Sequence, residues 1–272
     1  MVNGWNPSTL REALAIRAQY PVIPYAGGTD LMIAEEREGA YLFLNRIPEL
    51  KRIVREGNIL RMGAGCTFTE LLEHSETPAL LREALALIAA PAIRNEGTIG
   101  GNIANGSAKA DSALIFFVAD ASVRLQSIAG ERVLPIREFY LGRKKLDLRP
   151  DELITEVLLP LRWLDSYDYQ KIGARKALAI SRVAFAGLMT VENGIILHCA
   201  TAYGAVSDVI IRRPDLDAML IGKAVEQAKA LKSQYLAAYA EAIAPTQGRV
   251  SATYRKTVCL NLLDNFLKKF GV

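Results

Sequence analysis

Cysteine and histidine are scarce in this chain of 272 residues, which contains three cysteines and two histidines. Cys66, Cys199 and Cys259 lie far apart, without a CxxC pair or any other spacing that is typical of a metal site. His74 and His198 are equally isolated and are expected to be surface or packing residues. We therefore expect neither a zinc site nor an iron–sulfur cluster within this chain.

Long apolar runs and a strong net charge are also missing. No stretch approaches the roughly 18 consecutive apolar residues that a membrane-spanning helix needs, and the first residues, MVNGWNPSTL, lack the basic and then apolar pattern of a secretory signal. The formal charge is +4, from 33 Lys and Arg against 29 Asp and Glu. This excess is too small to indicate nucleic acid as a partner. We expect a cytoplasmic protein that binds neither nucleic acid nor a membrane.

What the chain does have is enough apolar sequence for two domains, since 51% of its residues are hydrophobic and domains usually span about 100 to 200 residues. In the first half, Thr9 and Thr67 each begin a capping box, and Thr77 precedes a proline that could open a helix. Short β-like runs, VIPYA, YLFLN and ILRMGAG, lie between these helices, and SVRLQSI with ERVLPI predicts a hairpin. The first half is therefore mixed α and β.

The pattern changes near residues 163–168. Two long extended runs meet at Asn193-Gly194, which is the strongest short signal for a β-hairpin because both residues tolerate positive φ. Helical stretches at 216–239 and 251–269 follow. This predicts a second α+β unit.

Two glycine-rich segments interrupt the first half, YAGGTDL at 25–31 and TIGGNIANGSAKAD at 98–111. Consecutive glycines allow backbone conformations closed to other residues and let a ligand approach the main-chain N–H groups. Two such loops could hold one diphosphate, although neither matches a Rossmann or P-loop motif. Either pair of glycines could equally form a turn or bulge, and Asp111 could simply cap the helix that follows it.

Six segments occur in a characteristic order and spacing: YAGGTDLM, PELKRIVREGNILRMGAGCTFTELLEH, PAIRNEGTIGGNIANGSAKAD, DELITEVLLP, YQKIGARKALAIS and VSATYRK. Together they resemble the FAD-binding medium subunits of the molybdenum hydroxylases, the family of xanthine, nicotinate and carbon monoxide dehydrogenases. The resemblance covers nearly the whole chain, from about residue 6 to residue 270.

The resemblance implies an α+β fold in two parts. Residues 1–165 would form an FAD-binding domain of the vanillyl-alcohol oxidase (PCMH) type, with two subdomains divided near residue 52. Residues 166–272 would form a small C-terminal domain like that of carbon monoxide dehydrogenase flavoproteins, with a three-stranded sheet and helices.

The resemblance also implies a set of FAD contacts. Two loops would bind the diphosphate, single residues would contact the remainder of FAD, and three isoleucines would lie near the flavin ring. For the isoleucines the alternative is core packing, and for Lys171 it is a solvated strand position. In chain order the implied residues are Pro24, Tyr25, Ala26, Gly27, Gly28, Thr29, Asp30, Leu31, Ile88, Thr98, Ile99, Gly100, Gly101, Asn102, Asp111, Ile154, Lys171 and Ile180.

The function implied is that of an oxidoreductase subunit with no catalytic side chain of its own. It would take electrons from two-iron two-sulfur clusters on a small subunit, after oxidation of a purine such as xanthine at a molybdopterin-containing large subunit, and pass them to NAD through FAD. The family often shows a Pro-x-x-Asp pattern here, but this chain has no proline three residues before Asp111, so the path of that loop is open. Two other functions stay possible: a free-standing flavin reductase of the same fold, and a flavin-free scaffold subunit.

Overall fold

The computed structural model describes residues 4–33, 39–248 and 250–272. The chain divides into two compact units that are interleaved in sequence. Unit 1 contains the residues up to Thr77 together with Ile88–Gly106 and Asp120–Pro160, and unit 2 contains Pro78–Leu87, Ser107–Ala119 and Leu161–Val272. The predicted domain boundary between residues 165 and 166 stays a prediction.

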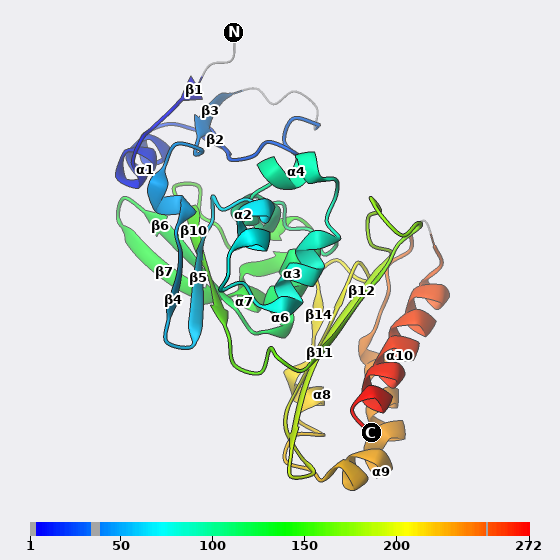
Figure 1. Cartoon of the computed structure of the whole chain (residues 1–272). Coiled ribbons are helices and arrows are strands. Elements are labelled where there is room, and N and C mark those ends of the chain that lie inside the picture. The colour runs from blue at the N-terminus through cyan, green and yellow to red at the C-terminus, as the bar shows by residue number, and fades with distance from the viewer. Residues whose placement is uncertain (1–3, 34–38, 249) are drawn as a thin grey trace. The chain divides into compact units, whose positions relative to one another are not determined.

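The described part of unit 1 is built on two larger sheets (Figure 1). The first is parallel, in the order β1-β3-β2, and the second is antiparallel, in the order β4-β5-β10-β6-β7. The elements of the first sheet and its helix are β1 (Gly4–Trp5), α1 (Leu10–Gln19), β2 (Val22–Tyr25), β3 (Ala40–Phe43) and the 3₁₀ turn η1 (Pro48–Lys51). The second sheet consists of β4 (Ile53–Glu56), β5 (Ile59–Gly63), β6 (Ser122–Ser127), β7 (Gly130–Pro135) and β10 (Leu153–Pro160).

Short helices complete unit 1. They are α2 (Phe68–Glu73), α4 (Pro91–Glu96), α5 (Ile99–Ala104) and α7 (Ile136–Phe139), and the small ladder of β8 (Tyr140–Gly142) with β9 (Lys145–Leu146) follows α7. The capping signals at Thr9 and Thr67 are confirmed: each hydroxyl accepts a hydrogen bond from the backbone N–H three residues later. The predicted hairpin of β6 and β7 is also confirmed.

Unit 2 is built on an antiparallel sheet of order β11-β12-β13-β14. Its strands are β11 (Tyr167–Ile172), β12 (Val183–Glu192), β13 (Ile195–Gly204) and β14 (Ile211–Arg212), and its helices are α3 (Ala79–Ala86), α6 (Asp111–Val118), α8 (Pro214–Asp217), α9 (Val225–Ala242) and α10 (Ala252–Lys269). Asn193 and Gly194 have φ of 51° and 75°, so the predicted hairpin between β12 and β13 is confirmed.

Helices cover both faces of this sheet. On one face, Val183, Phe185 and Met189 of β12 pack with residues of α9 and α10, which Figure 1 shows in orange and red. On the other face α6 packs against β12 and β13. Because β12 is covered on both sides, residues 183–189 are all buried, so apolar residues occupy consecutive positions of that strand.

Three local expectations differ from the structure. The sheet predicted to have three strands contains β14 as well, a two-residue strand too short to give a sequence pattern. The predicted helix at 216–239 is two helices, α8 and α9. Thr77 is not a cap: Pro78 is the N-cap of α3, which begins at Ala79, without a side-chain hydrogen bond. No helix in the described ranges is long and apolar enough to span a membrane.

A buried carboxylate joins the elements of unit 2. Asp217 is 1% exposed, and its oxygens accept hydrogen bonds from Tyr235 and Tyr239, each at 2.7 Å, and from the backbone N–H of Thr201 at 3.0 Å. It also forms an ion pair with Arg212. One side chain therefore links α8, α9, β13 and β14.

We expect Asp217→Ala to lower the free energy of unfolding by about 3–5 kcal/mol, because it removes a buried carboxylate that pairs with Arg212 and accepts hydrogen bonds from Tyr235 and Tyr239. Asp215→Ala is the matched control, since Asp215 forms an exposed ion pair with Arg213 and its loss should leave stability nearly unchanged. Urea unfolding of the two variants measures the difference, and equal losses would contradict a central role for Asp217.

Candidate functional site

The first glycine loop, residues 26–31, follows β2 and lies against the backbone before α5. A Cβ built on Gly27 would lie 1.7 Å from the carbonyl oxygen of Glu96 and 3.1 Å from the N atom of Gly97. No side chain can occupy that space, so the glycine is required by the close approach of two main chains. The two segments that the sequence analysis pairs are therefore brought together within unit 1.

Gly28 is a glycine for a different reason. Its φ is 68°, in the left-handed region, and a Cβ there would lie 2.2 Å from the hydroxyl oxygen of Tyr25. The tyrosine ring thus lies under the loop and fills the space beside Gly28. Conformation and packing together exclude any other residue at this position.

The backbone N–H groups of residues 26–31 have no acceptor among the residues that the structure describes. The loop bonds instead through its carbonyl groups: Gly28 O accepts from Met32 N at 2.9 Å and Asp30 O accepts from Ile33 N at 3.2 Å. Half-exposed main-chain donors that lie in succession form the kind of concavity that binds an anion.

The second segment, residues 98–102, differs from its prediction. Gly100 and Gly101 belong to the helix α5 and do not have positive φ, so the expectation of a backbone conformation closed to other residues is wrong here. Thr98 is the N-cap of α5, and its hydroxyl accepts from Gly101 N at 3.1 Å. Three further amides of the segment also donate within the chain: Ile99 to Cys66 O, Gly100 to Ala64 O and Asn102 to Thr98 O.

Close packing explains the glycines of this second segment. A Cβ on Gly100 would lie 2.6 Å from the Cβ of Ala64, and one on Gly101 would lie 2.9 Å from the hydroxyl oxygen of Thr98. Because its amides are bonded within the chain, this segment offers a ligand fewer main-chain donors than the first loop does. Its contact with a ligand stays a prediction.

Cys66 supports the second segment through its backbone and does not act as an exposed thiol. Its carbonyl accepts from Ile99 N at 3.0 Å, and its side chain is fully buried. Burial, and then the charge of Glu70, raise the pKa of this thiol to about 12. The thiolate needed for nucleophilic attack or metal binding is therefore not populated near neutral pH.

The apolar residues predicted near the flavin ring lie in different surroundings. Ile154, on β10, is 8% exposed, which also fits core packing. Ile88 is half-buried in unit 1, before α4, and Ile180 of unit 2 is 71% exposed. Their role near a flavin stays a prediction.

The polar residues of unit 2 form a buried cluster. Asp111 accepts hydrogen bonds from Lys171 Nζ and Ser181 Oγ, each at 2.7 Å, and Lys171 Nζ also donates to Leu87 O at 2.7 Å. The side chains of Asp111 and Lys171 are 7% and 9% exposed. Asp111 is the first residue of α6 and Ala110 is its N-cap, so the interpretation of Asp111 as the cap is wrong.

Ser181 is the member of this cluster that the sequence analysis did not identify. It is 3% exposed and lies two residues before the first residue of β12. Tyr169 of β11 is also buried, and burial followed by the charges of Asp111 and Glu83 raises its pKa well above the usual range. A small polar residue just before a long buried strand was the available signal for Ser181.

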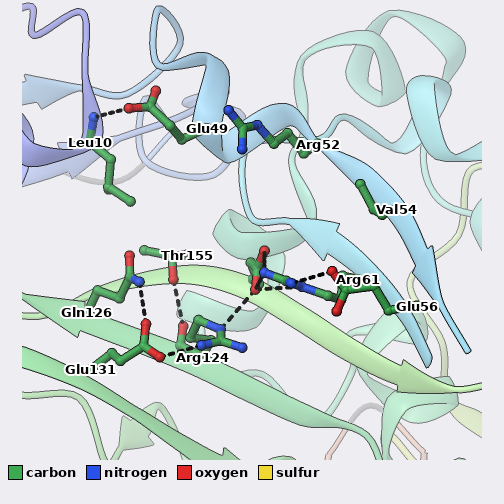
Figure 2. A pocket seen from close by; sticks show the side chains of 11 residues that line it. Leu10, Glu49, Arg52, Val54, Glu56, Arg61, Arg124, Gln126, Glu131 and Thr155 are labelled. Atoms are coloured by element: carbon green, nitrogen blue, oxygen red, sulfur yellow. Dashed lines mark hydrogen bonds and ion pairs between the residues drawn. The ribbon is translucent and has the colours of Figure 1, made fainter.

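A separate cavity of about 240 Å³ lies on the second sheet of unit 1, and its side chains bond to one another (Figure 2). Glu156 accepts from Arg61 at 2.7 Å and from Arg124 at 2.9 Å, and Arg124 also bonds to Glu131 at 2.5 Å. None of the residues lining it belongs to the predicted FAD contacts. These charges are satisfied within the chain, so the cavity is not the candidate site.

We expect Gly27→Ala to lower the free energy of unfolding by about 1–3 kcal/mol, because the added methyl group forces the two main chains apart. Gly142→Ala is the control, since a Cβ there would lie 3.9 Å from the Cβ of Lys145, an ordinary contact. Thermal unfolding of both variants tests this, and a Gly27→Ala protein as stable as the control would contradict the close approach.

Comparison with known proteins places these features in a family. Residues 1–162 match the model for the FAD binding domain in molybdopterin dehydrogenase, and residues 168–270 match that for the CO dehydrogenase flavoprotein C-terminal domain. The chain is 34% identical over 217 residues to a xanthine dehydrogenase FAD-binding subunit of Escherichia coli O157:H7, covering 75% of this chain and 74% of the relative. It is 31% identical over 232 residues to a nicotinate dehydrogenase FAD-subunit of Eubacterium barkeri, covering 79% and 78%.

The fold agrees with these matches. The structure of reconstituted CO dehydrogenase from Oligotropha carboxidovorans contains a chain that superposes with a TM-score of 0.88 at 26% identity, covering 97% of this chain and 96% of that one. The mixed α and β fold and the family suggested by the sequence segments are thereby confirmed. The chain belongs to the family of FAD-binding subunits of molybdopterin dehydrogenases, whose cofactor is FAD.

Proposed function

We propose that this chain is the electron-transfer subunit of a molybdenum-containing hydroxylase. It would receive electrons from two-iron two-sulfur clusters on a small subunit, which would be reduced by a molybdopterin-containing large subunit, and deliver them to NAD. The observation that carries this proposal is the match of both family models, which together cover nearly the whole chain.

The first glycine loop supports the FAD-binding part of the proposal. Its N–H groups at 26–31 are open among the described residues and lie in succession, which suits the two negative phosphates of FAD. In this proposal the loop binds the diphosphate, and Thr98 and Asn102 at the start of α5 also contact it. Gly27 fixes the position of these donors by bringing the loop against the backbone at Glu96.

The buried pair of Asp111 and Lys171 supports the proposal that residues of unit 2 also contact FAD. Lys171 is a cation held by Asp111 and by Leu87 O, and its place in a buried pair keeps its ammonium group in one position. We propose that Asp111 and Lys171 contact FAD, as the matching positions of the family do, with Ser181 fixing the orientation of the carboxylate. When bound, FAD accepts electrons singly and releases them as a hydride.

The organic substrate would be recognised by the large subunit. Relatives named for xanthine and for nicotinate are similar to this chain to nearly the same degree, 34% and 31%, so identity does not separate these substrates. Of these possible substrates we propose a purine such as xanthine. We further propose a cytoplasmic heterotrimer, with an FAD-binding domain at 1–165, its subdomains divided near residue 52, and a C-terminal domain at 166–272.

We expect Asp111→Asn to weaken FAD binding by roughly tenfold, or about 1.4 kcal/mol. The substitution removes the counter-ion of Lys171 and so disturbs the position of the ammonium group. Asp168→Asn is the control, because Asp168 belongs to the same unit and pairs with Lys269 near the surface. Flavin retention after gel filtration and the midpoint of thermal unfolding are measured together, and unchanged flavin affinity would remove Asp111 from the site.

The proposal that this chain binds FAD while another subunit oxidises the substrate can be tested with the purified full-length chain. Alone it should bind FAD, with absorbance bands near about 370 and 450 nm, and should pass electrons from NADH to an artificial dye. It should not oxidise xanthine, nicotinate or an aldehyde until the small and large subunits are added. Turnover of an organic substrate by the chain alone would favour a self-sufficient flavoenzyme, and failure to bind flavin would favour a scaffold.

A further inference from the structure

One side chain ties the first glycine loop to another element of unit 1. Asp30 accepts a hydrogen bond from Nδ2 of Asn105, the residue that follows α5. Among the described residues, this is the only hydrogen bond that a side chain of residues 26–31 makes to another element. The remaining contact described above, the approach of Gly27 to Glu96, is steric and does not fix the far end of the loop.

Asn105 is itself held in place by its neighbours. Gly106 has a φ of 57°, and a Cβ there would lie 2.9 Å from the Cα of Lys144. Lys144 N donates to Gly106 O at 3.1 Å, and Tyr140 donates from its hydroxyl to Ile103 O at 3.2 Å. The end of α5 is therefore packed against and hydrogen-bonded to residues 140–144, so that the side chain of Asn105 starts from a fixed backbone.

The charge of Asp30 makes this contact important for an anion site. A carboxylate close to main-chain donors competes with a phosphate for those donors unless another donor holds it. The amide of Asn105 is such a donor, and it adds no positive charge of its own. It also orders a loop whose N–H groups are open among the described residues, which reduces the entropy that binding must overcome.

We propose that Asn105 is a positioning residue, which holds Asp30 so that the N–H groups of residues 26–31 are fixed for a diphosphate. This inference rests on the proposed function of that loop. Nothing in the family resemblance assigned a role to Asn105, and it acts through Asp30 without a contact to FAD of its own.

The test exchanges the two polar groups in the full-length chain. Asn105→Asp places two carboxylates against each other and should weaken FAD binding by about tenfold in a fluorescence titration, which corresponds to about 1.4 kcal/mol. Asp30→Asn is the background for the double variant, because it keeps an oxygen that accepts from Asn105 and removes the carboxylate that Asn105→Asp would face. The double variant restores an amide facing a carboxylate and should bind FAD within about threefold of Asp30→Asn alone.

A matched control is available in the same unit. Gln126 donates from Nε2 to Glu131 at 2.7 Å, also an exposed amide bonded to a carboxylate. Gln126→Glu introduces the same repulsion away from the loop and should leave FAD affinity unchanged. Equal weakening by Gln126→Glu and Asn105→Asp would overturn the proposal, and so would failure of the double variant to recover.

A second measurement separates this inference from the proposed function. In the absence of FAD, Asn105→Asp should increase hydrogen exchange at the N–H of Met32, which bonds to Gly28 O in the loop, and Gln126→Glu should not. Unchanged exchange would show that Asn105 does not position the loop, even if the wild type binds FAD. Increased exchange in a chain that binds no FAD would retain the positioning role and overturn the proposed function.

Discussion

The close approach between Gly27 and the carbonyl of Glu96 is the constraint on which the candidate site depends. It brings together two segments that are about seventy residues apart in sequence, and it leaves no room for any side chain between their backbones. The first loop can then remain poor in internal hydrogen bonds because its position is set by contact with a folded neighbour. Its open donors are a consequence of that arrangement, since a loop that had to stabilise itself would use its own N–H groups.

The glycines of the two segments serve different physical purposes, although they look alike in sequence. Gly28 is required by a positive φ, Gly27 and Gly100 by close approach to another main chain, and none of these reasons can be read from the letters alone. The expectation that both segments present open amides was therefore only half supported. In the second segment the helix α5 uses Thr98 as its cap, and its amides are bonded within unit 1.

Local signals predicted much of the fold, because their causes lie within a few residues. The capping hydroxyls of Thr9 and Thr67 and the hairpin at Asn193 are of this kind. Asp111 could not be predicted in the same way: its partners Lys171 and Ser181 lie sixty and seventy residues later. A polar residue before a helix suggests a cap whether or not a distant cation binds it, so the sequence left two interpretations, and the folded contacts exclude the cap.

Lys171 shows why fold and site are coupled in unit 2. This unit is assembled from three separate stretches, Pro78–Leu87, Ser107–Ala119 and Leu161–Val272. The ammonium group of Lys171 lies on the third stretch and donates to Leu87 O on the first and to Asp111 on the second. A buried cation loses several kcal/mol of solvation, so it is stable only while both acceptors stay in place. The group that joins these three stretches is therefore the same group that the family resemblance assigns to FAD. A substitution at Lys171 would therefore change the fold and the proposed site together.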